Sequence, residues 1–290
     1  MINHISRQHE HTQNDQRING DAYDIKENTR ENYKKEDAMR ITRSIYVVGG
    51  TPVGLTDGND CTIYLIKGPS GIFLIDAGNG YDTEGLLNNI QDEGFNPQEI
   101  SHILITHHHT DHARGAKALK DAVGCEVWIS ENTGKHLLEN GTDEELGVLY
   151  AKEHGMYPMD YVYIHCPVDH GIHDEETCSI AGLDCKAINV IGHSYDSTCF
   201  LMELDGRKCL FCGDVIYYGG VIGLLNFPMS NLQDYHVGLP KLKGLEVDAL
   251  LPGHGLFCLK NGQDIINTGL KQLDSIFVPH SVKQTLISWI

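Results

Sequence analysis

The chain has 290 residues, of which 41% are hydrophobic and 21% are charged, so we expect a sizeable buried core. Its formal net charge of −18 argues against a nucleic-acid partner, because an acidic surface repels phosphate backbones. It contains no run of 18 apolar residues and its first residues are polar, so the sequence predicts neither a membrane association nor a secretory signal, and we expect a cytoplasmic protein.

Residues 1–42 are polar and mixed in charge, with no sustained helical or strand period, and we expect them to form a flexible N-terminal arm. The remaining residues, 43–290, are predicted to form one domain. It begins with three apolar strand candidates separated by turns, and a helix with one apolar face follows. These elements span residues 44–48, 61–67, 72–75 and 82–93.

The middle of the chain alternates strands and helices. A short apolar strand at 102–106 leads into a predicted helix at 111–123 and a further strand at 126–130. Such alternation indicates an α/β architecture. Residues 131–176 differ, because two helical stretches precede an aromatic, methionine-containing segment, and we interpret them as an insertion that flanks the functional site. Strands return at 185–191, 199–204, 208–212 and 247–251.

Histidine and aspartate residues follow the central apolar strand in a pattern typical of a metal site. The pattern is His-x-His-x-Asp-His, formed by His107, His109, Asp111 and His112. Residues two apart in an extended loop point the same way, so His107 and His109 can bind one metal while His108 points elsewhere. Asp111 and His112 stand at the start of the predicted helix and suit a second metal, since paired metals lie about 3.5–4 Å apart.

Three more candidate ligands also follow apolar strands, and each lies beside a glycine. They are His193, Asp214 and His254. Ligands in α/β sheets gather beyond the strand ends, and glycine lets the backbone turn sharply and approach closely. Imidazole and carboxylate donors suit Zn²⁺, and also Fe or Mn. The sequence therefore predicts a centre of two divalent metal ions, with zinc favoured.

Other residues of metal-binding type are interpreted as structural. The nine cysteines are an odd number, and without an export signal we expect reduced thiols. Cys209 and Cys212 have redox-motif spacing, but they lie in an apolar strand candidate and are predicted to face apart. His165, His170 and His173 are close enough in sequence for a secondary metal site, although surface histidines are the favoured interpretation.

Taken in order, these motifs resemble those of the metallo-β-lactamase superfamily over residues 45–256. The five matching motifs are Asp76 in Leu-Ile-Asp-Ala-Gly, the run from His107 to His112, then His193, Asp214 and His254. The resemblance implies an αββα sandwich, an α/β fold of four layers, with the metals at one edge between two sheets. It also implies that Asp76 orients a ligand without binding metal.

The resemblance further implies how the candidate residues divide between two metals. The first metal would be bound by His107, His109 and His193. The second would be bound by Asp111, His112 and His254. Asp214 would bridge both metals. Residues 43–290 would then be a catalytic domain, in which a metal-bridging hydroxide attacks the substrate and Asp111 accepts or relays a proton.

The superfamily contains several subfamilies with different reactions. True β-lactamases lack the bridging aspartate and are exported, and RNA-processing relatives carry a large extra domain, so neither class is favoured. Glyoxalase II-like thioesterases and mononuclear-iron dioxygenases stay open as alternatives. Acyl-homoserine-lactone lactonases have a tyrosine three residues after the bridging aspartate, and Tyr217, followed by Tyr218, occupies that position here.

We therefore expect a dinuclear-metal-dependent hydrolase of a small ester, lactone or thioester, with lactonase-like chemistry favoured. Asp111 and Tyr217 are the predicted catalytic residues, since a phenol can donate to the oxygen on which charge develops. The expected partner is a small-molecule substrate, with no nucleic acid and no membrane. Whether copies of the chain assemble into a homo-oligomer stays open.

Overall fold

The computed structural model describes residues 39–50 and 54–281, and the predicted N-terminal arm lies outside them up to residue 38. Met39 and Arg40 form a short strand that pairs with residues 46 and 47, although both lie within the predicted arm. A two-residue strand is held by backbone hydrogen bonds at a sheet edge, so it leaves no periodic pattern in the sequence. The first sheet therefore begins earlier than predicted.

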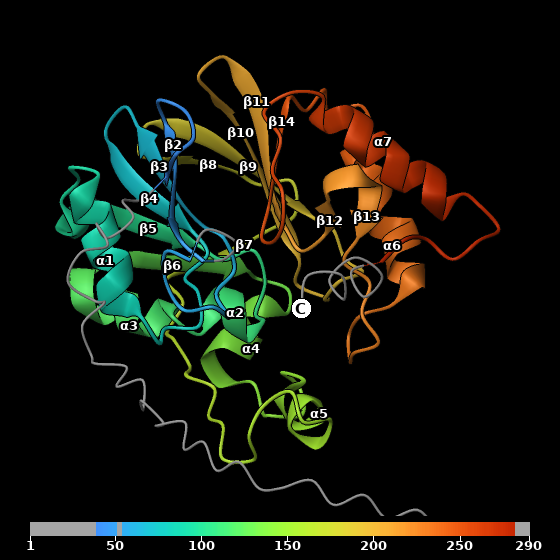
Figure 1. Ribbon diagram of the computed structural model, residues 1–290, viewed down its shortest axis with the longest axis horizontal. Coiled ribbons are helices and arrows are strands. Elements are labelled where there is room, and N and C mark those ends of the chain that lie inside the picture. Colours follow the sequence, from blue (N-terminus) through green and yellow to red (C-terminus); the bar gives the residue numbers. More distant parts are fainter. Residues whose placement is uncertain (1–38, 51–53, 282–290) are drawn as a thin grey trace, which may run out of the picture. The chain divides into compact units, whose positions relative to one another are not determined.

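The first sheet has seven strands that follow one another in chain order (Figure 1). They are β1 (Met39–Arg40), β2 (Ile45–Gly49), β3 (Ile63–Gly68), β4 (Gly71–Ile75), β5 (Ile100–Leu104), β6 (Glu126–Ser130) and β7 (His170–Ile172). The first four strands pair antiparallel, and β4 to β7 pair parallel. The predicted hairpin is confirmed, with Gly68 opposite Gly71 at its turn.

The second sheet has five strands in the order β14-β11-β10-β9-β8. Their bounds are β8 (Thr177–Ile180), β9 (Leu183–Asn189), β10 (Thr198–Leu204), β11 (Arg207–Gly213) and β14 (Ala249–Pro252). The pair β14 and β11 at one edge of this sheet is parallel, and the other pairs are antiparallel. A small separate ribbon consists of β12 (Ile216–Tyr217) and β13 (Val221–Ile222).

Helices cover the outer face of each sheet (Figure 1). Their bounds are α1 (Thr83–Asp92), α2 (Thr110–Ala113), α3 (Ala116–Val123), α4 (Gly134–Asn140), α5 (Val148–Glu153), α6 (Leu232–Gly238) and α7 (Gly262–Leu273), with short 3-10 turns η1 (Pro97–Glu99), η2 (Tyr218–Gly220) and η3 (Leu239–Leu242). Leu86 of α1 and Leu119 of α3 pack on the first sheet, whereas Tyr235 of α6 and Ile266 of α7 pack on the second.

A third apolar cluster fills the space between the two sheets. Phe73 from the first sheet and Phe200 and Phe211 from the second are fully buried there, and the rings of Phe211 and Tyr64 meet edge to face with centroids 5.3 Å apart. Alternate residues of each strand thus supply the inner and outer cores. The order helix, sheet, sheet, helix confirms the predicted αββα sandwich.

Three parts of the chain differ from the sequence prediction. The helix predicted at 111–123 is broken between α2 and α3 at Gly115, whose added Cβ would lie 2.2 Å from the carbonyl oxygen of Ala77. The predicted insertion 131–176 carries α4 and α5 as expected, but its last part forms β7, which pairs with β6. The helices α6 and α7 were not predicted.

The cysteines and the helices bear on two further expectations. Cys209 packs in the cluster between the sheets, while Cys212 packs under the helices of the second sheet, so the two thiols face apart as predicted. None of the nine cysteines forms a disulfide. Within the described ranges 39–50 and 54–281, no helix combines the length and the apolar character that crossing a membrane requires.

Candidate metal centre

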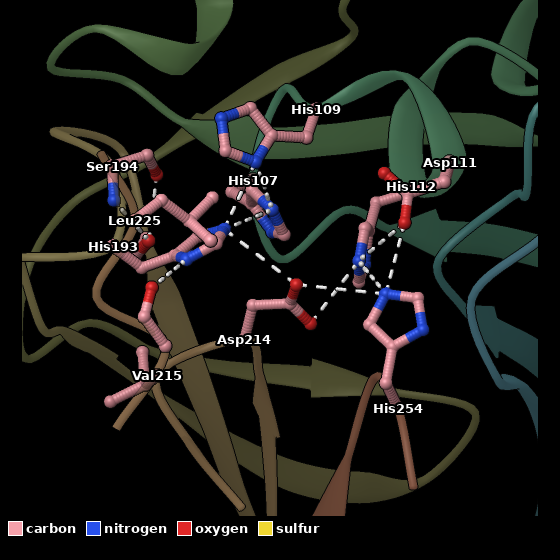
Figure 2. A network of polar contacts seen from close by, with 12 residues as sticks. His107, His109, Asp111, His112, His193, Ser194, Asp214, Val215, Leu225 and His254 are labelled. Carbon is pink, nitrogen blue, oxygen red and sulfur yellow. Dashed lines mark hydrogen bonds and ion pairs between the residues drawn. The ribbon is translucent and has the colours of Figure 1, made fainter. Parts of the chain in front are cut away.

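Seven histidine and aspartate side chains meet where strands of both sheets end (Figure 2). Four of them follow β5, on the loop after it and on α2, and the other three follow β9, β11 and β14. The seven are His107, His109, Asp111, His112, His193, Asp214 and His254. The structure therefore brings together every residue that the sequence predicted as a metal ligand.

Three ring nitrogens form the first group of donors. His107 Nε2 lies 3.0 Å from His109 Nδ1 and 3.1 Å from His193 Nε2, and the latter two atoms lie 2.9 Å apart. A zinc ion with bonds of about 2.0–2.1 Å would hold tetrahedral ligands roughly 3.3 Å apart. Three mutually close nitrogens cannot all be joined by good hydrogen bonds, so this spacing suits lone pairs that converge on a cation.

Asp111, His112 and His254 form the second group of donors. Asp111 Oδ2 lies 2.9 Å from His254 Nε2 and 3.5 Å from His112 Nε2. The two ring nitrogens lie 3.3 Å apart. The group therefore has the spacing that a second divalent ion requires, with one carboxylate and two imidazoles as donors.

Asp214 lies between the two groups. Its Oδ1 is 3.3 Å from His112 Nε2, and its Oδ2 is 3.6 Å from both His193 Nε2 and His254 Nε2. Oδ1 is buried and accepts no hydrogen bond from any residue that the structure describes. A buried carboxylate oxygen without a donor is costly unless a cation compensates it. This is the arrangement expected of a bridging ligand.

The protonation states of the first donor group and of the two carboxylates suit metal binding. Burial and the neighbouring histidines lower the pKa of His107 and of His109 well below the usual value, so both rings are neutral at pH 7 and keep a free lone pair. Burial opposes ionisation of Asp111, but His112 and His254 lower its pKa to about 2. The same two histidines hold the pKa of Asp214 well below its usual range. In the second group, burial opposes protonation, but neighbouring acidic groups raise the pKa of His112 and of His254 above the usual value, so a cation bound there displaces protons.

Contacts behind the donors orient their rings. His112 Nδ1 donates to Asp76 Oδ2 at 2.9 Å, and His193 Nδ1 donates to the carbonyl oxygen of Gly223 at 2.6 Å. Asp76 thus fixes the ring of a ligand and stays outside the centre, as the resemblance implied. Gly253 makes room for the centre, because an added Cβ would lie 2.5 Å from His112 Cε1.

Asp196 fastens two ligand-bearing segments together. His108 is fully buried and turned away from the centre, as predicted, and both its backbone N–H and its Nδ1 lie 2.8 Å from Asp196 carboxylate oxygens. Ser194, the neighbour of His193, donates to the same carboxylate at 2.7 Å. The carboxylate therefore joins the loop after β5 to the loop after β9.

Asp196 is a residue of the site that was not predicted from the sequence. The available signal was a charged residue in the short turn between two apolar strands, three residues after His193. The pairing with His108 spans 88 positions of the chain, so sequence spacing alone does not reveal it. Burial of all three residues makes the contact a fixed part of the centre's surroundings.

The predicted catalytic tyrosine lies next to the centre. Tyr217 is 9% exposed, and burial and the nearby Asp214 carboxylate raise the pKa of Tyr217 well above its usual value. Its phenol is therefore protonated at neutral pH and can donate a hydrogen bond. Tyr218 is 55% exposed and belongs to the turn that follows. Of the two tyrosines, Tyr217 is thus the buried one, and its pKa responds to Asp214.

The segment predicted as an insertion packs beside the centre. The ring of Phe227 meets both His109 and Tyr150 of α5 edge to face, with centroids 5.6 Å apart in each pair. Arg114, two residues after a donor of the second group, donates from Nε to the carbonyl oxygen of Val162 at 3.0 Å. These contacts hold residues of the 131–176 segment as one wall next to the donors.

Comparison with known proteins agrees with this geometry. The family model of the metallo-β-lactamase superfamily matches residues 56–254, more than half of the chain. Among solved structures, a subclass B3 metallo-β-lactamase of Bradyrhizobium japonicum superposes with a TM-score of 0.62 at 22% identity, and the match covers 81% of this chain and 90% of that one. At this identity the likeness shows the shared fold.

Three sequence relatives carry names that describe thioester hydrolysis. An atrochrysone carboxyl ACP thioesterase of Aspergillus fumigatus is 26% identical over 73% of this chain and 56% of its own length. Hydroxyacylglutathione hydrolase GloC of Haemophilus influenzae is 27% identical over 63% of this chain and 80% of its length. Acyl-coenzyme A thioesterase MBLAC2 of Gallus gallus is 27% identical over 68% of this chain and 73% of its own length.

The match to another fungal relative, the lactamase-like protein adaB of Aspergillus niger, covers 76% of this chain but only 57% of the relative. This chain therefore spans little more than half the length of the fungal proteins that it matches. The family model, the four-layer fold and the position of the seven donors at the strand ends agree with one another. The chain belongs to the metallo-β-lactamase superfamily.

Proposed function

We propose that this protein is a dinuclear-metal-dependent hydrolase that cleaves thioesters of small acyl groups. The two groups of three donors joined by Asp214 carry this proposal, because seven donors exceed what one tetrahedral ion can use. Zinc is the favoured metal, with Fe or Mn as alternatives, because all seven donors are imidazoles or carboxylates. The names of the three thioesterase relatives support the substrate class.

Ions bound at this centre would supply a Lewis acid for the carbonyl group and would activate a water molecule for attack. The chain's own residues then position the reacting groups. Tyr217 keeps its proton and lies beside Asp214, so it can donate to the carbonyl oxygen as negative charge develops there. We also propose that Asp111, whose carboxylate is ionised, accepts or relays a proton.

The wall beside the centre suits an acyl chain. Met156 and Met159 are 70% and 69% exposed on the segment that Arg114 ties to the centre. Methionine side chains adapt to irregular apolar ligands. The acidic chain makes nucleic acid an unsuitable substrate. We also propose a cytoplasmic protein, and nine cysteines without a disulfide are consistent with a reducing compartment.

Lactone hydrolysis is the second candidate, and Tyr217 is the observation that favours it, because its position matches the tyrosine of the lactonase subfamily. A mononuclear-iron dioxygenase is the alternative from a different reaction class. Metal content separates the dioxygenase from the two hydrolases. Two ions per chain support hydrolysis, whereas a single iron with oxygen uptake supports the dioxygenase.

The first prediction tests the centre and the substrate together. Purified protein is expected to bind two transition-metal ions at the centre and to hydrolyse acyl-coenzyme A, acyl-glutathione or acyl-pantetheine esters in preference to lactones. Asp214→Ala removes the bridging charge and is expected to lower turnover by orders of magnitude while the fold survives. Elemental analysis and a substrate panel give the readout.

Asp184→Ala serves as the matched control, because Asp184 is an exposed aspartate near the start of β9 and is not one of the donors. It is expected to keep full metal content and activity. His109→Ala should lose at least one of the two ions. An Asp214→Ala protein with wild-type turnover, or a wild-type centre that saturates with one ion at full activity, would show that the dinuclear assignment is wrong.

A further inference from the structure

A second cluster of metal-binding side chains lies apart from the seven donors. It consists of His170 on β7, Glu176 in the connection and Cys178 on β8. Glu176 Oε1 lies 2.8 Å from His170 Nε2 and 3.1 Å from Cys178 Sγ, and the three donor atoms all lie within 4.8 Å of one another. The two distances from Glu176 Oε1 are close to those between the nitrogens of the first donor group.

The surrounding contacts hold these three atoms in place. The other carboxylate oxygen, Glu176 Oε2, accepts a hydrogen bond from the backbone N–H of His173 at 2.7 Å, which leaves Oε1 facing His170 and Cys178. The ring of Trp128 packs against His170 with centroids 4.6 Å apart. A carboxylate and a ring that are fixed from behind are the usual setting of metal ligands.

The carboxylate of the cluster carries a charge, and its thiol keeps a proton that a cation could displace. Burial alone would raise the pKa of Glu176. The His173 N–H, Cys178 and His170 instead lower this pKa to about 2, so the carboxylate is ionised. Burial and that same carboxylate raise the pKa of Cys178 to about 12, so the thiol keeps its proton. A divalent cation placed among the three atoms would favour the thiolate and offset the carboxylate charge.

We propose that His170, Glu176 and Cys178 form an additional metal site, separate from the dinuclear centre, that binds Zn²⁺ or a similar borderline cation. Thiolate, imidazole and carboxylate together are donors that Zn²⁺ accepts, whereas Mg²⁺ and Ca²⁺ prefer oxygen alone. The side chains of His170 and Glu176 are 39% and 25% exposed, so the fourth position is open to water. The site therefore exchanges its metal more readily than an enclosed one.

The cluster lies where an edge strand of the first sheet is followed in the chain by an edge strand of the second. β7 is the last strand of the first sheet, and β8 is the last strand of the second. The side chains of His170 and Cys178 come from these two edges. An ion bound there would join the free edges of the two sheets, which are otherwise connected at this end by the short chain segment between them.

The test uses Co²⁺ as the probe, with the full chain kept reduced. None of the seven donors of the main centre is a cysteine, so cobalt bound by these donors gives no thiolate-to-metal charge-transfer band. A band from Cys61, which lies near His112, would persist in Cys178→Ser. We expect that the first two equivalents of Co²⁺ produce only weak visible bands. A third equivalent should add an intense near-ultraviolet thiolate band and raise the melting temperature.

Matched variants assign the band. Cys178→Ser should abolish the thiolate band and the third equivalent, and Glu176→Gln should weaken the third equivalent by about 10-fold or more. Cys185→Ser is the control, because Cys185 lies directly opposite Cys178 on β9 and is not part of the cluster. It should keep the band, and all three variants should keep hydrolytic activity.

Two results would overturn the proposal. One is the absence of any thiolate band in the wild-type protein at saturating Co²⁺, which would leave Glu176 as a hydrogen-bond acceptor alone. The other is a band that persists in Cys178→Ser. Neither result depends on the dinuclear centre, whose occupancy is measured separately by the first two equivalents and by turnover.

Discussion

Single residues around the donors decide how well the centre is formed. The sequence predicted the seven donors because each of them follows an apolar strand and stands in a recognisable motif. It also predicted that His108 points elsewhere, because side chains alternate in an extended loop. It did not reveal Asp196, whose contacts with His108 and Ser194 depend on two loops that meet only in the folded chain.

A prediction at this scale concerns Asp196. Asp196→Asn places an amide NH₂ against one of the two donors of His108, so the loop after β5 should shift relative to His193. We expect the affinity of the first metal to fall by roughly 10-fold, the lower end of the effect of losing a contact behind a ligand, because Asp196 holds the chain neighbours of the ligands and not the ligands themselves. The second metal should bind as in the wild type. Competition titration with a chelator measures both affinities.

Tyr163→Phe is the control for Asp196→Asn. The hydroxyl of Tyr163 donates to the carbonyl oxygen of His108 at 2.8 Å, so this variant loses a buried hydrogen bond on the same residue but leaves the Asp196 carboxylate in place. If both variants bind two metals equally well, or if Asp196→Asn loses both metals to the same degree, the carboxylate has no positioning role at the first metal.

Another residue-scale prediction concerns the phenol of Tyr217. Removing one hydrogen-bond donor to a developing oxyanion costs about 2.7–4 kcal/mol in well-studied enzymes. Tyr217→Phe is therefore expected to lower kcat by about 10-fold or more and to leave metal content unchanged. Tyr218→Phe, which changes an exposed neighbour, should have little effect. Steady-state kinetics on the best substrate compare the kcat values of the two variants. An unchanged kcat in Tyr217→Phe would remove the main support for lactone chemistry.

At the scale of elements, the sequence predicted the long apolar strands and the strongly periodic helix α1 well. Most residues of β10 and β11 are buried, and such apolar runs are typical of strands inside a sheet. The short strands β7 and β8 were missed, because three or four residues with mixed burial carry no usable period. Their position depends on the neighbours β6 and β9, which supply the hydrogen bonds.

The break between α2 and α3 shows why a helical pattern alone was misleading. Apolar residues recur at helical spacing on both sides of Gly115, so the pattern predicted one helix over 111–123. Gly115 instead approaches the loop after β4, and its N–H donates to the carbonyl oxygen of Gly78 at 2.8 Å. The break lets the short helix α2 direct Asp111 and His112 toward the centre while α3 packs on the sheet.

For the molecule as a whole, the αββα arrangement could be predicted because the motifs occur in the same order as in a superfamily with that fold. Composition alone supported only a folded domain with a large core. The pairing order of the second sheet, with β14 beside β11, does not follow from chain order. It requires the parallel pairing of two strands that are separated by β12, η2, β13, α6 and η3, and local sequence patterns do not specify such long-range contacts.

The centre draws its donors from both sheets, and neither sheet can bind the metals alone. Four donors follow β5, and three follow β9, β11 and β14. Metal binding should therefore couple the local opening of the two sheets. In hydrogen-exchange measurements, amides near the ends of β5 and β11 should exchange slowly and together in the loaded protein. After chelation they should exchange faster and at separate rates, so that the exchange pattern itself reports whether the two halves are joined.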